Sequence, residues 1–160
     1  MAELDVKELA AYIQKKYYEE KQREISPIKL QKALYFLFAY WGGMVRKSQL
    51  YPEAVEEDFS KFDKYLFDDE FEAWVYGPVI PSVYKENNIS KFYNENLFAG
   101  KEKLKEFIDD LLKDLFNTSD FTLVEVSHND NSWKNNFSYD ENYHNNKIDR
   151  DQIIEEYARK

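Results

Sequence analysis

The stretch over residues 71–81 (Phe-Glu-Ala-Trp-Val-Tyr-Gly-Pro-Val-Ile-Pro) constrains the fold more than any other part of the chain. Gly77 can adopt backbone angles that are closed to other residues, whereas Pro78 fixes its own φ and donates no hydrogen bond. We therefore expect Pro78 to open a helix, because the first N–H groups of a helix lack intrahelical partners. Trp74 and Tyr76 place large rings beside the turn. The stretch is predicted to form a corner of the core.

Capping residues and apolar spacing predict two helices before this corner. Asp5 caps a helix that runs to about residue 21. Ser26 and Pro27 open a second helix, which we expect to end near residue 41 because Gly42 and Gly43 can stop it. This second helix is apolar on most sides, which predicts a central and buried position.

The rest of the chain is predicted to form short helices and loops, together with one long amphipathic helix. The expected elements are a short helix over 55–66, a strand or helix end over 71–76, a helix over 79–85, an irregular loop over 89–100, an amphipathic helix over 101–116, a helix or strand over 119–126, a polar loop from 129, and a capped helix over 149–157. The pattern predicts a mainly α, compact single-domain fold over residues 1–160, and it leaves a small β-hairpin or short sheet open.

The composition limits the classes of protein to consider. Hydrophobic residues make up 43% of the chain and charged residues 33%, which is typical of a globular protein. The formal net charge of −9 would attract a basic partner and disfavours nucleic acid, unless Lys15, Lys16, Lys21 and Arg23 gather as a basic patch. The 13 Tyr, 12 Phe and 3 Trp residues fit an aromatic-rich core or an aromatic binding surface, of which the core is the simpler interpretation.

The chain lacks the features of an exported or membrane protein. It has no cysteine, so a disulfide framework is excluded and a reducing compartment suits it. Its first residues lack the basic start and apolar run of a signal peptide, and no stretch approaches the roughly 20 apolar residues of a membrane helix. We expect a cytoplasmic protein without a membrane partner.

No set of residues predicts an enzyme. A cysteine nucleophile is absent, and the 4 glycines form no phosphate-binding loop. A metal site formed by His128 and His144 with Asp130, Asp140 and Glu141 is conceivable, although nothing in the spacing requires it. We therefore predict no catalytic residues, no metal and no cofactor.

Two kinds of polar residue are open to a structural and a functional interpretation. His128 is simply explained as an imidazole that bonds a backbone carbonyl and holds the chain toward Trp133, and the alternative is contact with a partner. Lys29 and Lys32 lie on an otherwise apolar helix. They extend to water, or they meet acidic groups of the protein or of its partner.

Three blocks of sequence occur in a fixed order. They are Lys-Leu-Gln-Lys-Ala-Leu-Tyr-Phe from Lys29, Glu-Ala-Trp-x-Tyr-Gly-Pro-Val-x-Pro-x-Val-Tyr from Glu72, and Val-x-Val-Ser-His-x-Asp-x-x-Trp from Val124. In this order they resemble the Panacea domain, a family of SocA-like antitoxins and phage-associated proteins. The resemblance spans roughly residues 25–157 and leaves residues 1–22 as an N-terminal helix.

The resemblance implies an antitoxin of a toxin–antitoxin or phage–host system, which neutralises a partner toxin by direct binding. A proteolytic adaptor, a DNA-binding autoregulator and an unrecognised phage enzyme remain as alternatives, and a homodimer is left open. The residues expected to bind the partner or to form the motif are Lys29, Gln31, Lys32, Tyr35, Trp74, Tyr76, Gly77, Pro78, Val79, His128 and Trp133.

Overall fold

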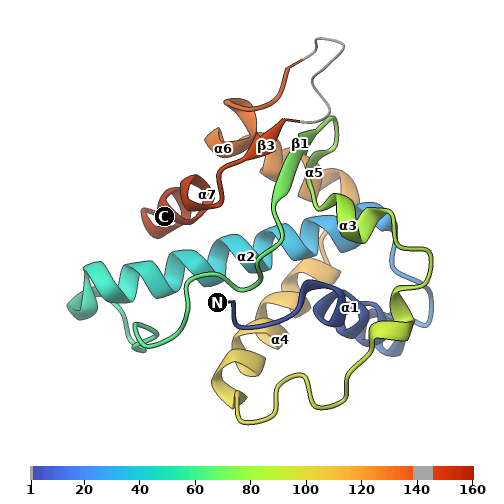
Figure 1. Ribbon diagram of the computed structural model, residues 1–160, viewed down its shortest axis with the longest axis horizontal. Coiled ribbons are helices and arrows are strands. Elements are labelled where there is room, and N and C mark those ends of the chain that lie inside the picture. The colour runs from blue at the N-terminus through green and yellow to red at the C-terminus, as the bar shows by residue number, and fades with distance from the viewer. Residues whose placement is uncertain (1, 139–145) are drawn as a thin grey trace.

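The computed structural model describes residues 2–138 and 146–160 as a mainly helical fold around one long helix (Figure 1). Helix α2 (Pro27–Leu50) begins where the Ser26 hydroxyl accepts a hydrogen bond from the backbone N–H of Lys29, at 3.0 Å. Most side chains of α2 are buried, because other elements pack on nearly every side of it. The predicted fold class, mainly α with a short sheet, is confirmed.

Helix α2 continues through Gly42 and Gly43, so the prediction that this pair ends the helix is wrong. Both glycines lie against α7 (Arg150–Ala158). A Cβ atom on Gly42 would lie 2.5 Å from Cγ1 of Ile154, and one on Gly43 would lie 2.8 Å from the backbone carbonyl carbon of Tyr157. The glycines therefore allow two helices to approach closely, and they remain helical because that packing outweighs their weak helix propensity.

The other long helices follow the capping residues. Helix α1 (Val6–Lys21) begins at Asp5, whose carboxylate accepts from the N–H groups of the first turn. Helix α4 (Glu102–Phe116) packs one apolar stripe against α2. Helix α5 (Asp120–His128) begins at Ser119, and it resolves the helix-or-strand alternative in favour of the helix.

Short elements connect these helices, and two further predictions about the connecting segments are wrong. They are η1 (Pro52–Ala54), η2 (Ile89–Phe92), α3 (Pro81–Tyr84) and α6 (Asn131–Lys134). Residues 55–66 contain no helix; Trp41 instead donates from Nε1 to the carbonyl of Asp63 at 3.0 Å and packs its ring against Phe59 and Phe62. The segment predicted as a polar loop from 129 includes α6, which Glu156 of α7 caps by accepting the N–H groups of its first residues. In both segments, contacts with distant parts of the chain determine the structure, and the local spacing of apolar residues does not.

The sheet has three antiparallel strands in the order β2-β1-β3. They are β1 (Phe71–Trp74), β2 (Gly77–Val79) and β3 (Lys147–Ile148). Pro78 therefore lies in a strand and opens no helix, which corrects the prediction, and the helix expected over 79–85 begins only at Pro81. Because β2 is an edge strand, the missing N–H of Pro78 costs no ladder bond to a further strand.

Candidate partner-binding surface at the β1–β2 hairpin

The hairpin formed by β1 and β2 turns through Val75 and Tyr76, two residues that are 43% and 61% exposed. Gly77 follows the turn with φ of +106°, so the predicted use of a positive φ at this glycine is found. Its α-carbon is also enclosed, since a Cβ there would lie 2.5 Å from Oγ of Ser127 and 2.8 Å from Cε of Lys32. The tip of the hairpin is exposed while its base is packed tightly.

Two side chains of α2 form hydrogen bonds with the backbone of β2 and of Ile80, the residue that follows it. The Lys32 ammonium donates to the carbonyl of Pro78 at 2.6 Å. The Gln31 amide accepts from the N–H of Ile80 at 2.8 Å and donates to the carbonyl of the same residue at 3.3 Å. These bonds satisfy backbone groups that an edge strand would otherwise leave without a partner.

Lys32 meets no acidic group among the described residues, and it does not extend to water, since its residue is 1% exposed. Burial lowers the pKa of the Lys32 ammonium to about 7. The interpretation that this lysine reaches solvent is therefore wrong. Its alkyl chain instead fills the space under Gly77, which the missing side chain of that residue leaves free.

Residues of α5 and α6 also form hydrogen bonds with the backbone of the hairpin. Nε2 of His128 lies 2.8 Å from the carbonyl oxygen of Val75, and Nε1 of Trp133 donates to the carbonyl of Trp74 at 2.8 Å. The two rings stack on one another with centroids 4.1 Å apart, and Phe137 stacks on the far face of Trp133 at 4.6 Å. A stack of three rings thus positions the two donors at the consecutive carbonyls of Trp74, which ends β1, and Val75, which begins the turn.

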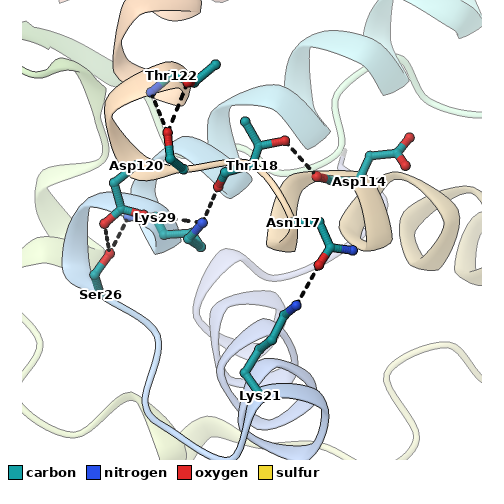
Figure 2. A network of polar contacts seen from close by, with 9 residues as sticks. Lys21, Ser26, Lys29, Asp114, Asn117, Thr118, Asp120 and Thr122 are labelled. Atoms are coloured by element: carbon teal, nitrogen blue, oxygen red, sulfur yellow. Dashed lines mark hydrogen bonds and ion pairs between the residues drawn. The ribbon is translucent and has the colours of Figure 1, made fainter.

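Lys29 lies apart from the hairpin, in a polar network that joins the start of α2 to the turn between α4 and α5 (Figure 2). Its ammonium donates to the carbonyl of Thr118 and lies 3.3 Å from a carboxylate oxygen of Asp120. The Ser26 hydroxyl donates to the other carboxylate oxygen at 2.5 Å. Of the two interpretations of Lys29, contact with an acidic group of the protein is the one found.

Tyr35 also lies away from the surface. Its hydroxyl and that of Tyr157 both donate to the same oxygen of Asp130, each at 2.5 Å. Burial, followed by the charge of Asp130, raises the pKa of the Tyr35 hydroxyl well above its ordinary value. Tyr35 therefore joins α2, α7 and the segment before α6, and its ring packs against Phe71 at the start of β1.

An apolar pocket of about 310 Å³ opens beside the hairpin. One wall is the hairpin, with Trp74, Tyr76 and Val79, and the other is the first turns of α2. Tyr84 of α3 stands at the rim, 59% exposed, with its ring edge against Trp74. Sequence reasoning did not include Pro27, Ile28, Val75 or Tyr84 among the expected contacts, although Tyr84 closes the second sequence block and so carried a signal.

A known protein family matches the middle of the chain. The family model described as "Antitoxin SocA-like, Panacea domain" matches residues 54–134, about half of the chain. The chain belongs to this family. The resemblance inferred from the three blocks is confirmed, and the match includes the hairpin, Tyr84, His128 and Trp133 of this Panacea domain. The block that starts at Lys29 lies before the matched residues.

Searches of the curated proteins and of the solved structures return no significant match. In the described part of the chain, no helix is long and apolar enough to cross a membrane. No group of three or more His, Asp and Glu side chains there is arranged to hold a metal ion. The conceivable metal site involving His144, Asp140 and Glu141 lies mainly outside the described residues.

Proposed function

We propose that this Panacea-domain protein is an antitoxin that neutralises a partner toxin by direct, stoichiometric binding at the β1–β2 hairpin. The observation that supports this most is the exposed turn of a hairpin whose backbone carbonyls are held by donors from α2, α5 and α6. A preorganised surface loses little conformational entropy on binding, so its apolar contacts contribute more fully to affinity.

The residues around the pocket have the chemistry of a protein-binding hot spot. Tyr76 and Tyr84 are exposed aromatic residues, and both line the same hollow. Large rings beside a concave apolar surface supply most of the binding energy in many interfaces. In this proposal Trp74, Tyr76 and Tyr84 contact the toxin. The residues that hold the surface in shape are Gln31, Lys32, Gly77, Pro78, Val79, His128 and Trp133.

The acidic character of the chain favours a basic toxin. A net charge of −9 speeds the encounter with a positively charged protein and slows the encounter with nucleic acid. The basic residues near the N-terminus are already engaged separately: Lys16 lies 3.7 Å from Asp109, and Lys15 lies over the ring of Tyr93. This arrangement gives little support to the DNA-binding alternative.

Co-expression tests the proposal. We expect a neighbouring reading frame to encode a protein that is toxic alone, harmless with this chain, and co-purified with it at one to one. The double variant Tyr76→Ser/Tyr84→Ser should lose neutralisation and co-purification while it keeps the melting temperature of the parent. Tyr51→Ser is the matched control, because Tyr51 is 58% exposed but lies after the opposite end of α2.

Two results would contradict direct neutralisation. If no neighbouring product is toxic and pull-downs from host lysate return no protein, the antitoxin function is wrong. Rescue that disappears in a protease-deficient host would instead identify the chain as an adaptor that delivers the toxin to a protease. Tyr51→Ser failing together with the double variant would show that the hairpin has no special role.

A further inference from the structure

The hairpin pocket is one end of a longer groove. A second hollow of about 510 Å³ shares Pro27, Gln31 and Tyr84 with the hairpin pocket. A third hollow of about 400 Å³ shares Gln14 and Glu24 with the second. Because neighbouring hollows share lining residues, the three lie next to one another in a row, and we call them together the α1–α2 groove.

The groove crosses one side of the molecule. Figure 1 shows α1 and α3 on the same side of the fold, flanking the start of α2. The middle hollow is lined from all of these elements, with Gln14 from α1, Leu30 from α2 and Val83 from α3. Segments that are far apart in the sequence thus form a single path from the hairpin to Tyr18 and Tyr93.

The chemistry of the groove changes along its length. The hairpin end is lined by apolar side chains such as Trp74 and Val79. The far end has the rings of Tyr18 and Tyr93, which are 54% and 40% exposed, among polar neighbours that include Lys15 and Glu24. The middle hollow is lined by two acidic residues, Glu24 and Glu86. An extended segment that follows the groove would therefore meet the apolar hairpin pocket, then acidic surface, and then the two rings of the far hollow.

The two carboxylates differ in their partners. Glu86 is neutralised within the protein, since Lys7 and Lys91 lie 3.2 Å and 3.3 Å from its oxygens. Glu24 is exposed and forms no ion pair with any residue that the structure describes. It lines both the middle and the far hollow and is exposed, so a segment that occupies either hollow would lie beside it. The nearby Lys15 of the far hollow has its ammonium over the ring of Tyr93.

We propose that the α1–α2 groove binds one extended segment of the toxin, in which a basic residue lies between two large apolar residues. This rests on the proposed antitoxin function. The basic side chain pairs with Glu24, and the two apolar side chains enter the hollows at the ends of the groove. Charge complementarity with a chain of net charge −9 selects a basic segment, and the apolar anchors supply most of the affinity.

A charge reversal in the complex purified with the neutralised toxin tests this assignment. Glu24→Lys should weaken toxin binding by about tenfold or more at low salt, with less effect at high salt. The control Glu53→Lys makes the same change of net charge on η1, at an exposed residue outside the groove, and it should bind like the parent. Both variants should have the same melting temperature as the parent, because neither side chain is buried.

Two further readouts identify the segment. Hydrogen exchange in the complex should protect the turn at Val75, the chain from Glu24 to Ile28, and the end of α1 near Tyr18. Changing the basic residue of the bound toxin segment to Glu should restore binding to Glu24→Lys, which a structural role of Glu24 could not produce.

The outcomes separate this inference from the proposed function. If the toxin is neutralised and Tyr76→Ser/Tyr84→Ser abolishes binding, but Glu24→Lys binds like Glu53→Lys, the groove assignment is wrong and the antitoxin function stands. Protection confined to the hairpin would overturn it in the same way. If no neighbouring product is neutralised, the proposed function fails first, and the groove assignment falls with it.

Discussion

Replacing Gly77 with valine should destabilise the whole domain. The backbone φ of +106° is costly for any residue with a Cβ, and most of all for a β-branched one. The new Cβ would also lie 2.5 Å from Oγ of Ser127 and 2.8 Å from Cε of Lys32. Neither neighbour moves freely, because Ser127 donates to the carbonyl of Val124 at 2.8 Å and Lys32 is held by Pro78.

The magnitude follows from these two effects. A strained backbone costs about 1–3 kcal/mol, and overpacking a buried site costs about 1–3 kcal/mol more. A loss of about 4 kcal/mol is a large part of the roughly 5–15 kcal/mol that stabilises a typical domain. At about 2–4 °C per kcal/mol for a chain of this size, the melting temperature should fall by roughly 8–16 °C.

Gly100→Val is the matched control for Gly77→Val. Gly100 also has a positive φ, +72°, but a Cβ there would have no atom within 4 Å. The control should therefore show the cost of backbone strain without the clash, and its loss of stability in urea should be the smaller one. If Gly77→Val melts within a few degrees of the parent, Gly77 is only a permissive turn residue and the reasoning from the enclosed Cβ position is refuted.

Four further predictions follow. Because the buried Lys32 releases its proton near pH 7 whereas the unfolded lysine keeps it to about 10.5, the penalty for burying its charge is full below pH 7 and is relieved as pH rises toward 10. Urea unfolding should therefore show stability rising over that window, and Lys32→Met should flatten the rise; an unchanged slope would contradict the burial argument. Gly43→Ala should lower stability by about 1–3 kcal/mol although alanine favours helices, because its Cβ would meet Tyr157, and a gain in thermal melting would disprove the close helix contact. Trp133→Phe should cost about 1 kcal/mol for the lost bond to Trp74, measured by chemical denaturation, and an unchanged midpoint would show that this bond is unimportant. Duplex DNA from the upstream region should not bind at sub-micromolar concentration in a gel shift at moderate salt, and tight sequence-specific binding would favour an autoregulator.

The local features of this fold could be predicted from the sequence because their causes are local. Asp5, Ser26 and Ser119 mark helix starts, since a capping side chain binds N–H groups only two or three residues away. The amphipathic spacing of α4 likewise depends on one helix alone. The family, too, is indicated by residue order alone, because the three sequence blocks are read directly along the chain.

Where the prediction failed, a contact between distant segments had decided the outcome. Gly42 and Gly43 are suited to a helix end, yet α7 packs against them and the helix continues. Pro78 is suited to the start of a helix, yet β1 and the ammonium of Lys32 hold it in an edge strand. Local propensity amounts to about 1 kcal/mol per residue at such positions, which tertiary packing readily exceeds.

The candidate surface likewise depends partly on the sequence and partly on contacts between distant segments. The sequence blocks selected Lys32, His128 and Trp133, but they did not show what these residues do. Each of the three bonds a backbone carbonyl of the hairpin from 46 to 59 positions away. A carbonyl is present at every residue, so no sequence pattern marks which one will be the partner. The sequence determined which side chains could form this site, and only the tertiary structure decided that most of them support the hairpin, while Tyr76 of the turn and Tyr84 of α3 are exposed.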